Sequence, residues 1–256
     1  MPDPLEKYRS VSYRSLESRR VLITGGASGI GAEIVAAFRA QRSQVDFIDV
    51  DREAGEAWAA ASGGRFTYCD LTDIAALRAA VAKLQKAGPF NILVNNAGKD
   101  DRHAMADIEP DSWRRTLALN LDHQFFVTQA VAPVMAEAGG GSVIMLGSVS
   151  WMRGRPGMVG YTTSKAAING LAKTLSRELG PSGIRVNSIV PGAILTERQR
   201  KLWLTQELNQ QFLDLQALKF RLEGSHVARI ALFLGSDESI GCTGANFMVD
   251  AGLTQN

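Results

Sequence analysis

A tyrosine and a lysine, Tyr161 and Lys165, lie four residues apart in the stretch VGYTTSKAAI. Residues at this spacing share one face of a helix. A tyrosine releases its proton only near pH ~10, but a neighbouring ammonium favours the phenolate, so such a pair could transfer a proton near neutral pH. A solvated helix face would show the same two residues, so the chemical interpretation needs support from the rest of the chain.

A glycine-rich stretch, TGGASGIG, covers residues 24–31 between a short apolar run and a helical pattern. Gly25, Gly29 and Gly31 would let the pyrophosphate of a dinucleotide approach backbone N–H groups at a helix N-terminus. The spacing GxxxGxG is a variant of the dinucleotide fingerprint, and a plain strand-to-helix turn is the alternative. Asp49 ends the next apolar run, where a carboxylate binds an adenosine ribose and repels a 2′-phosphate. This predicts NAD, with NADP as the alternative because Arg52 is close by.

Strand and helix patterns alternate along the whole chain. This alternation predicts an α/β fold: a single-domain, doubly wound parallel sheet of the Rossmann type with helices on both faces. Residues 1–18 are interpreted as an N-terminal tail, and residues 19–256 as one domain. The pattern over 113–136 predicts one long helix, bent near Pro133. Strand patterns cover 20–23, 45–50, 65–69, 91–94, 142–146, 185–190 and 247–249, and helical patterns 32–41, 53–61, 73–86, 163–179, 196–215 and 228–234.

Composition excludes several classes of protein. The chain has 256 residues, of which 45% are hydrophobic and 21% charged, and its net charge of +2 comes from the first twenty residues. It therefore lacks the basic patch of a nucleic-acid binder. The apolar runs fall short of the ~18 residues of a membrane helix, and the N-terminus lacks the apolar core of a secretory signal. Two cysteines far apart predict neither a disulfide nor a zinc site, and they favour a cytoplasmic location.

Several further motifs occur in a fixed order: NNAG at 95–98, Asn120, Ser148 thirteen residues before Tyr161, and Pro191-Gly192. Together with TGGASGIG, Asp49 and YTTSK, these make the sequence resemble the short-chain dehydrogenase/reductase family over nearly its whole length. One departure is Gly147, where the family often has a second serine.

The resemblance implies a catalytic set of Asn120, Ser148, Tyr161 and Lys165. Tyr161 would be the general acid and base, Lys165 would favour its phenolate and hold the nicotinamide ribose, and Ser148 would bind the reacting oxygen. Asn120 would hold a water on the proton path. A strand-end cap at Ser148 and a helix-face amide at Asn120 are the alternatives. No metal is expected.

The resemblance also implies a cofactor site at the ends of the strands. Several of its residues, taken singly, could equally be turn residues. The predicted cofactor-binding residues are Gly25, Ser28, Gly29, Ile30, Gly31, Asp49, Asp70, Leu71, Asn96, Ala97, Gly98, Tyr161, Lys165, Pro191, Gly192, Ile194 and Thr196.

The stretches NNAGKDDRH, GSVSW and CTGANFMVDAG look like those of bacterial aldose 1-dehydrogenases that act on D-xylose, L-arabinose or related 6-deoxyhexoses. A sugar needs several hydrogen-bonding side chains and an apolar plate, and Trp151 could be that plate. A solvated loop at DDRH and a core or subunit contact at Trp151 are the alternatives. A segment at about 193–215 would cover the substrate. The candidate hydrogen-bonding residues are Ser148, Ser150, Tyr161, Asp100, Asp101 and His103.

These observations favour an enzyme that oxidises an aldopyranose to its aldonolactone. A sugar-acid or polyol dehydrogenase acting on a secondary alcohol is the first alternative. A 3-oxoacyl-type ketone reductase and a nucleotide-binding regulator without catalysis are weaker ones, because Asp49 disfavours NADP and the Tyr161–Lys165 pair is intact. By resemblance, a homotetramer is expected through the long helices at 113–136 and 163–179.

Overall fold

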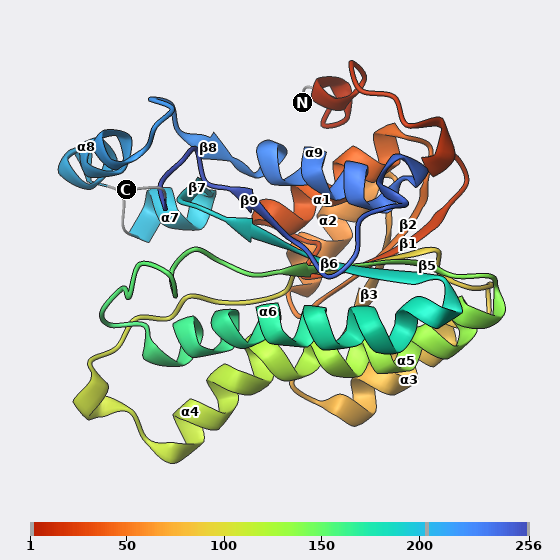
Figure 1. Ribbon diagram of the computed structural model, residues 1–256, viewed down its shortest axis with the longest axis horizontal. Coiled ribbons are helices and arrows are strands. Elements are labelled where there is room, and N and C mark those ends of the chain that lie inside the picture. Colours follow the sequence, from red (N-terminus) through yellow and green to blue (C-terminus); the bar gives the residue numbers. More distant parts are fainter. Residues whose placement is uncertain (1–2, 203–204, 255–256) are drawn as a thin grey trace.

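The computed structural model describes residues 3–202 and 205–254, and in this part of the chain seven parallel strands form one sheet (Figure 1). The strand order is β3-β2-β1-β4-β5-β6-β9. Residues 1–2 of the predicted tail, 203–204 of the predicted covering segment and 255–256 of the predicted domain lie outside the described residues. The strands are β1 Arg20–Thr24, β2 Gln44–Asp49, β3 Arg65–Tyr68, β4 Ile92–Asn95, β5 Gly141–Leu146, β6 Ile184–Pro191 and β9 Asn246–Val249.

Helices cover both faces of the sheet, and the predicted doubly wound fold is confirmed (Figure 1). On one face, α1 (Gly29–Ala40), α2 (Arg52–Ser62) and α9 (Gly224–Gly235) pack on a core that includes Phe38 and Phe47. On the other face, α3 (Ile74–Gln85), α5 (His123–Glu137) and α6 (Val159–Leu179) enclose a second apolar core. The inner strands β1, β2, β4, β5 and β6 are largely buried between these layers, which explains their continuous apolar runs.

The strand order reverses between β1 and β4, because the chain builds outward from β1 to β3 and then returns to add β4 on the other side. Neighbouring chain segments diverge at such a point and leave a crevice outside the carboxyl ends of the strands. The residues that follow β1, β2, β4, β5 and β6 all reach this edge. The site should therefore lie there.

The long helix predicted over 113–136 is divided in the structure. α4 (Pro110–Leu117) and α5 are joined by a π-helical turn at Ala118–Asp122, and Pro133 lies inside α5. The predicted bend near Pro133 stays a prediction, and the interruption that the structure shows is the π turn. Asn120 occupies the π turn and donates a hydrogen bond to the carbonyl oxygen of Thr116 at 3.0 Å. Single π turns of this kind are frequent at functional sites.

The N-terminal segment, residues 3–18, is docked on the domain and is not a free tail. Tyr8 and Leu16 are fully buried in the core beneath α1 and α9. The hydroxyl of Tyr8 donates to the carboxylate of Glu33 at 2.5 Å, and Arg229 donates to the carbonyl oxygen of Lys7 at 2.8 Å. The polar composition of the segment concealed these two apolar anchors.

Two further helices lie beyond the carboxyl edge of the sheet, where a covering segment was predicted (Figure 1). α7 (Glu197–Leu202) and α8 (Gln206–Leu215) lie between β7 (Ile194–Leu195) and β8 (Leu222–Glu223), which pair in parallel. None of the described helices is both long and apolar enough to cross a membrane. Short 3₁₀ helices complete the fold at Glu6–Tyr8, Arg14–Leu16, Met105–Asp107, Gly180–Ser182 and Asp237–Ser239.

Candidate active site

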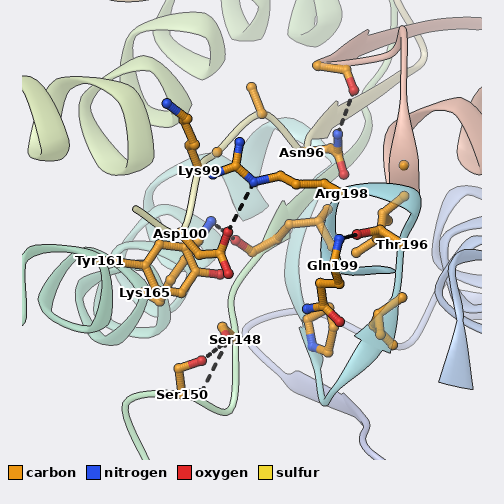
Figure 2. Close-up of a pocket in the computed structure, with 18 of the residues that line it drawn as sticks. Asn96, Lys99, Asp100, Ser148, Ser150, Tyr161, Lys165, Thr196, Arg198 and Gln199 are labelled. Atoms are coloured by element: carbon orange, nitrogen blue, oxygen red, sulfur yellow. Dashed lines mark hydrogen bonds and ion pairs between the residues drawn. The ribbon is translucent and has the colours of Figure 1, made fainter. Parts of the chain in front are cut away.

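A cavity of about 800 Å³ opens at the carboxyl edge of the sheet (Figure 2). Every residue that was predicted to hold the cofactor lines this cavity, and so do Ser148 and Ser150. The structure therefore brings together residues from Gly25 to Thr196 that are far apart in the chain. The roles assigned to them stay predictions.

The glycines after β1 form a close backbone approach. A Cβ at Gly31 would lie 2.5 Å from Nδ2 of Asn96 and overlap the carbonyl oxygen of Gly25. Gly25 itself has φ +67°, a conformation that L side chains rarely adopt. Ser28 precedes α1 without capping it through its side chain, so the first N–H groups of the helix remain available to a ligand. This geometry fits the pyrophosphate of a dinucleotide.

Asp49 is held in place by the backbone around it. Its carboxylate accepts hydrogen bonds from the N–H groups of Ala27 at 2.9 Å, Val50 at 2.8 Å and Asp51 at 3.1 Å. Arg52 points elsewhere: its guanidinium lies 4.5 Å from the ring centre of Tyr68 and is absent from the lining of the cavity as described. The carboxylate of Asp49 therefore lines the described cavity, whereas the guanidinium of Arg52 does not.

Tyr161 and Lys165 come from the first turns of α6, and Ser148 follows β5 (Figure 2). The ammonium of Lys165 lies 5.6 Å from the ring centre of Tyr161 and donates to the carbonyl oxygen of Leu146 at 2.8 Å. The hydroxyls of Ser148 and Ser150 share a hydrogen bond of 2.9 Å. The helix spacing and the end of β5 thus place a phenol, an ammonium and a hydroxyl on one wall of the cavity.

Burial shifts both titrating groups toward their neutral forms. It lowers the pKa of Lys165 to about 7. It raises the pKa of Tyr161 to about 12, an effect that the Ser148 hydroxyl partly offsets and the negative charge of Asp100 increases. A positive charge brought into this cavity would favour the phenolate form of Tyr161.

His123 of α5 lies behind the site, next to Ala97 and Lys165. It is fully buried, and burial followed by the charge of Lys165 lowers its pKa to about 3. The ring is therefore neutral at physiological pH, and its Nε2 lies 3.0 Å from the carbonyl oxygen of Ala97. It supports the wall that Ala97 and Gly98 present to the cavity.

Asn120 does not line the cavity but lies directly behind its wall. Its Oδ1 accepts from the N–H of Lys99 at 2.9 Å, and a Cβ on Gly98 would be 2.9 Å from Oδ1 and 3.2 Å from Nζ of Lys165. The amide is thus next to Lys165 and is engaged with the loop after β4. Its contribution to a proton path remains a prediction.

Trp151 and His103 also lie outside the lining, contrary to the sugar contacts expected of them. Trp151 is half-buried, and its Nε1 has no partner in the described structure. Besides Tyr161, the aromatic residue that lines the described cavity is Phe212 of α8. The structure therefore gives no support to Trp151 as the apolar plate.

Several charged residues of the lining were not singled out from the sequence. Arg198 of α7 lies 3.6 Å from Asp100 (Figure 2). Arg198 also lies 3.2 Å from Asp101, and Lys99 lies 3.0 Å from Asp101. These ion pairs join the covering segment to the loop after β4. The additional charged lining residues are Lys99, Arg102, Arg153, Arg155, Glu197, Arg198 and Arg221.

Comparisons with known proteins agree with this geometry. A family model described as enoyl-(acyl carrier protein) reductase matches residues 25–254. D-xylose 1-dehydrogenase of Caulobacter vibrioides is 44% identical over 248 residues, which is 95% of this chain and 98% of that protein. A probable galactose dehydrogenase of Rhizobium meliloti is 42% identical over 251 residues, with 95% and 98% covered. A 3-oxoacyl-[acyl-carrier protein] reductase of Brucella melitensis, solved with bound NAD, superposes with a TM-score of 0.86 at 32% identity, covering 98% of this chain and 95% of that one.

Proposed function

Because the chain belongs to the short-chain dehydrogenase/reductase family, we propose that it is an NAD-dependent sugar dehydrogenase that oxidises an aldopyranose to its aldonolactone. The observation that carries the proposal is the gathering of Tyr161, Ser148 and Lys165 at one end of a cavity whose other end is a dinucleotide cradle. The relatives named for D-xylose and galactose support the choice of a sugar and of the anomeric hydroxyl.

The nicotinamide cofactor, when bound, would supply a positively charged hydride acceptor. The chain's own task is to hold the sugar hydroxyl and remove its proton. Tyr161 is the group placed for this, because its phenol faces the cavity beside the hydroxyl of Ser148. Ser148 would donate a hydrogen bond to the reacting oxygen and keep it within reach of the phenolate.

Lys165 would assist from behind Tyr161. Its Nζ, now bonded to the carbonyl oxygen of Leu146, has two further N–H donors for ribose hydroxyls. With a pKa of about 7, it could also exchange a proton at neutral pH with a water that Asn120 would hold. We therefore assign the proton-transfer work to Tyr161, Ser148 and Lys165, and a supporting position to Asn120.

The substrate is tested by mixing the protein with NAD and a panel of free sugars while following the absorbance of the reduced cofactor. We expect turnover of D-xylose, L-arabinose or D-galactose and formation of the lactone, because the anomeric hydroxyl is the one to be oxidised. The polyol galactitol, which lacks an anomeric carbon, is the control. Turnover of galactitol with none of the aldoses would move the assignment to a secondary alcohol.

We propose NAD as the physiological cofactor on the basis of Asp49. Its fixed carboxylate would accept hydrogen bonds from the two ribose hydroxyls and repel a 2′-phosphate. Replacing Asp49 with serine should lower kcat/KM for NAD by ~10- to ~100-fold, the worth of hydrogen bonds to a charged group. The same variant should gain activity with NADP.

The matched control for this change is Asp51→Ser. Asp51 caps α2 by accepting from the N–H of Ala54 at 3.0 Å and does not line the cavity described here. Steady-state kinetics with both cofactors should show an unchanged NAD/NADP ratio for this variant. An unchanged ratio in Asp49→Ser as well would contradict the assignment of Asp49. The homotetramer expected by resemblance and the cytoplasmic location expected from the two cysteines stay part of this proposal.

A further inference from the structure

Three arginines surround one aromatic ring inside the cavity. The guanidiniums of Arg153, Arg155 and Arg221 lie 5.9, 5.5 and 5.0 Å from the ring centre of Phe212. All four residues line the cavity. Arg153 and Arg155 come from the loop after β5, Phe212 from α8, and Arg221 from the residue before β8, so three separate segments converge here.

These arginines have ring contacts but no acceptors for their N–H groups. The three side-chain nitrogens of Arg221 are buried without a hydrogen-bond partner among the described residues. No side-chain hydrogen bond or ion pair joins Arg153 or Arg155 to the part of the chain that the structure describes. An aromatic face attracts a cation, but it does not satisfy the five N–H donors that each guanidinium carries. Leaving such donors buried and unsatisfied is unfavourable.

The like charges also repel one another. Burial lowers the pKa of Arg155 most, and the charges of Arg102 and Arg153 lower it further. The charge of Asp100 opposes these effects in part, but Asp100 is itself paired with Arg198, and Asp101 is paired with Arg198 and Lys99. An excess of positive charge therefore remains around Phe212.

This arginine site, Arg153, Arg155 and Arg221 around Phe212, belongs to the substrate end of the cavity. The N–H of Arg153 donates to the carbonyl oxygen of Val149 at 3.2 Å and that of Arg155 to Ser150 at 3.3 Å, so both arginines are fixed to the turn that carries Ser148. Asp49, which would bind the adenosine ribose, follows β2 near the other edge of the sheet. The missing anion is therefore not expected to come from the cofactor.

We propose that the arginine site binds an anionic group on the sugar, a carboxylate or a phosphate, so that the preferred substrate is an acidic or phosphorylated aldopyranose. The inference rests on the proposed function, which identifies the rest of the substrate as an aldopyranose. Guanidiniums bind both anions through paired N–H groups, and burial strengthens these bonds. Neutral aldoses would still be oxidised, but they would leave the three arginines unsatisfied.

The experiment compares matched sugars by calorimetry on the protein saturated with NADH, in which no oxidation can occur. D-galactose, D-galacturonate and D-galactose 6-phosphate are one set, and D-glucose, D-glucuronate and D-glucose 6-phosphate are the other. We expect at least one anionic sugar to bind ~10- to ~100-fold more tightly than its neutral parent, as for hydrogen bonds to a charged group. Preference for the carboxylate or for the phosphate identifies which anion the site takes.

Variants then test whether the arginines are responsible. Arg221→Met keeps an apolar stem over Phe212 but removes the charge, and it should bring the ratio of the affinities for the anionic and the neutral sugar toward one. Arg221→Lys should retain part of the preference. The control is Arg177→Met, an equal change of charge at an exposed position of α6 outside the cavity lining. Thermal unfolding should show that Arg221→Met is folded.

The inference is overturned if anionic and neutral sugars bind equally, if no anionic sugar binds, or if Arg221→Met, Arg153→Met and Arg155→Met all keep the wild-type ratio. These outcomes are independent of turnover. A preserved preference for anions, together with no reduction of NAD by any aldose, would support the arginine site and contradict the proposed oxidation.

Discussion

Replacing Tyr161 with phenylalanine is expected to lower kcat by ~10²- to ~10⁴-fold, the usual contribution of a general acid or base. The change removes only the hydroxyl and keeps the ring over which Lys165 lies at 5.6 Å. Burial and the charge of Asp100 raise the pKa of the phenol to about 12, so a positive charge brought beside this oxygen, such as that of a bound nicotinamide, would act on it to favour the basic phenolate. Without the oxygen, the described part of that wall offers no other titrating proton in contact with Ser148.

Single-turnover kinetics and NAD titration should be measured on the same preparation. The affinity for NAD should stay close to that of the wild type, because Lys165 and the glycine cradle are untouched. Tyr68→Phe is the control, since its ring is 47% exposed and lies outside the lining described for the cavity. Tyr161→Phe activity within ~10-fold of the wild type would contradict the role given to Tyr161.

Replacing Gly31 with alanine is expected to abolish cofactor binding. The new methyl would overlap the carbonyl oxygen of Gly25 and lie 2.5 Å from Nδ2 of Asn96. Asn96 holds the cradle by donating to the carbonyl oxygens of Thr24 and Gly25 at 3.0 and 2.9 Å, so the backbone has to move. A displacement of about 1 Å at such a site can cost ~10²-fold, and the overpacking should cost about 1–3 kcal/mol of unfolding free energy.

Fluorescence titration with NADH and chemical denaturation measure the two effects separately. Gly241→Ala is the control, because a Cβ at Gly241 would meet no atom within 4 Å. If Gly31→Ala binds NADH with wild-type affinity, the backbone around Gly25 and Gly31 accommodates a methyl group that the present geometry excludes. The Gly25–Asn96 contact would then not define the cofactor site.

The site residues that the sequence could predict are those whose position follows directly from a neighbouring strand or from the helix that carries them. Gly25, Asp49, Asn96 and Ser148 each directly follow a strand, and parallel strands bring their carboxyl ends to one edge. Tyr161 and Lys165 share a helix face. For these residues, recognising the elements is nearly equivalent to placing the side chains.

The remaining features depend on contacts between distant segments. Nothing around Arg221 in the sequence indicates that its guanidinium lies over the ring of Phe212, together with those of Arg153 and Arg155. Trp151 follows Ser150 directly, yet it is not part of the lining described for the cavity. Asn120 was placed on a regular helix, because hydrophobic periodicity does not register one extra residue in a π turn.

The docked N-terminal segment has a consequence for the order of folding. Ser15 donates to the carboxylate of Glu238 at 3.1 Å and accepts from the N–H of Asp237 at 3.1 Å, contacts that span more than two hundred residues. During synthesis the chain grows from its N-terminus, so Asp237 and Glu238 are made long after Ser15. These two contacts of the docked segment can therefore form only once the chain beyond α9 has been translated, although the contact of Tyr8 with Glu33 of α1 is available much earlier.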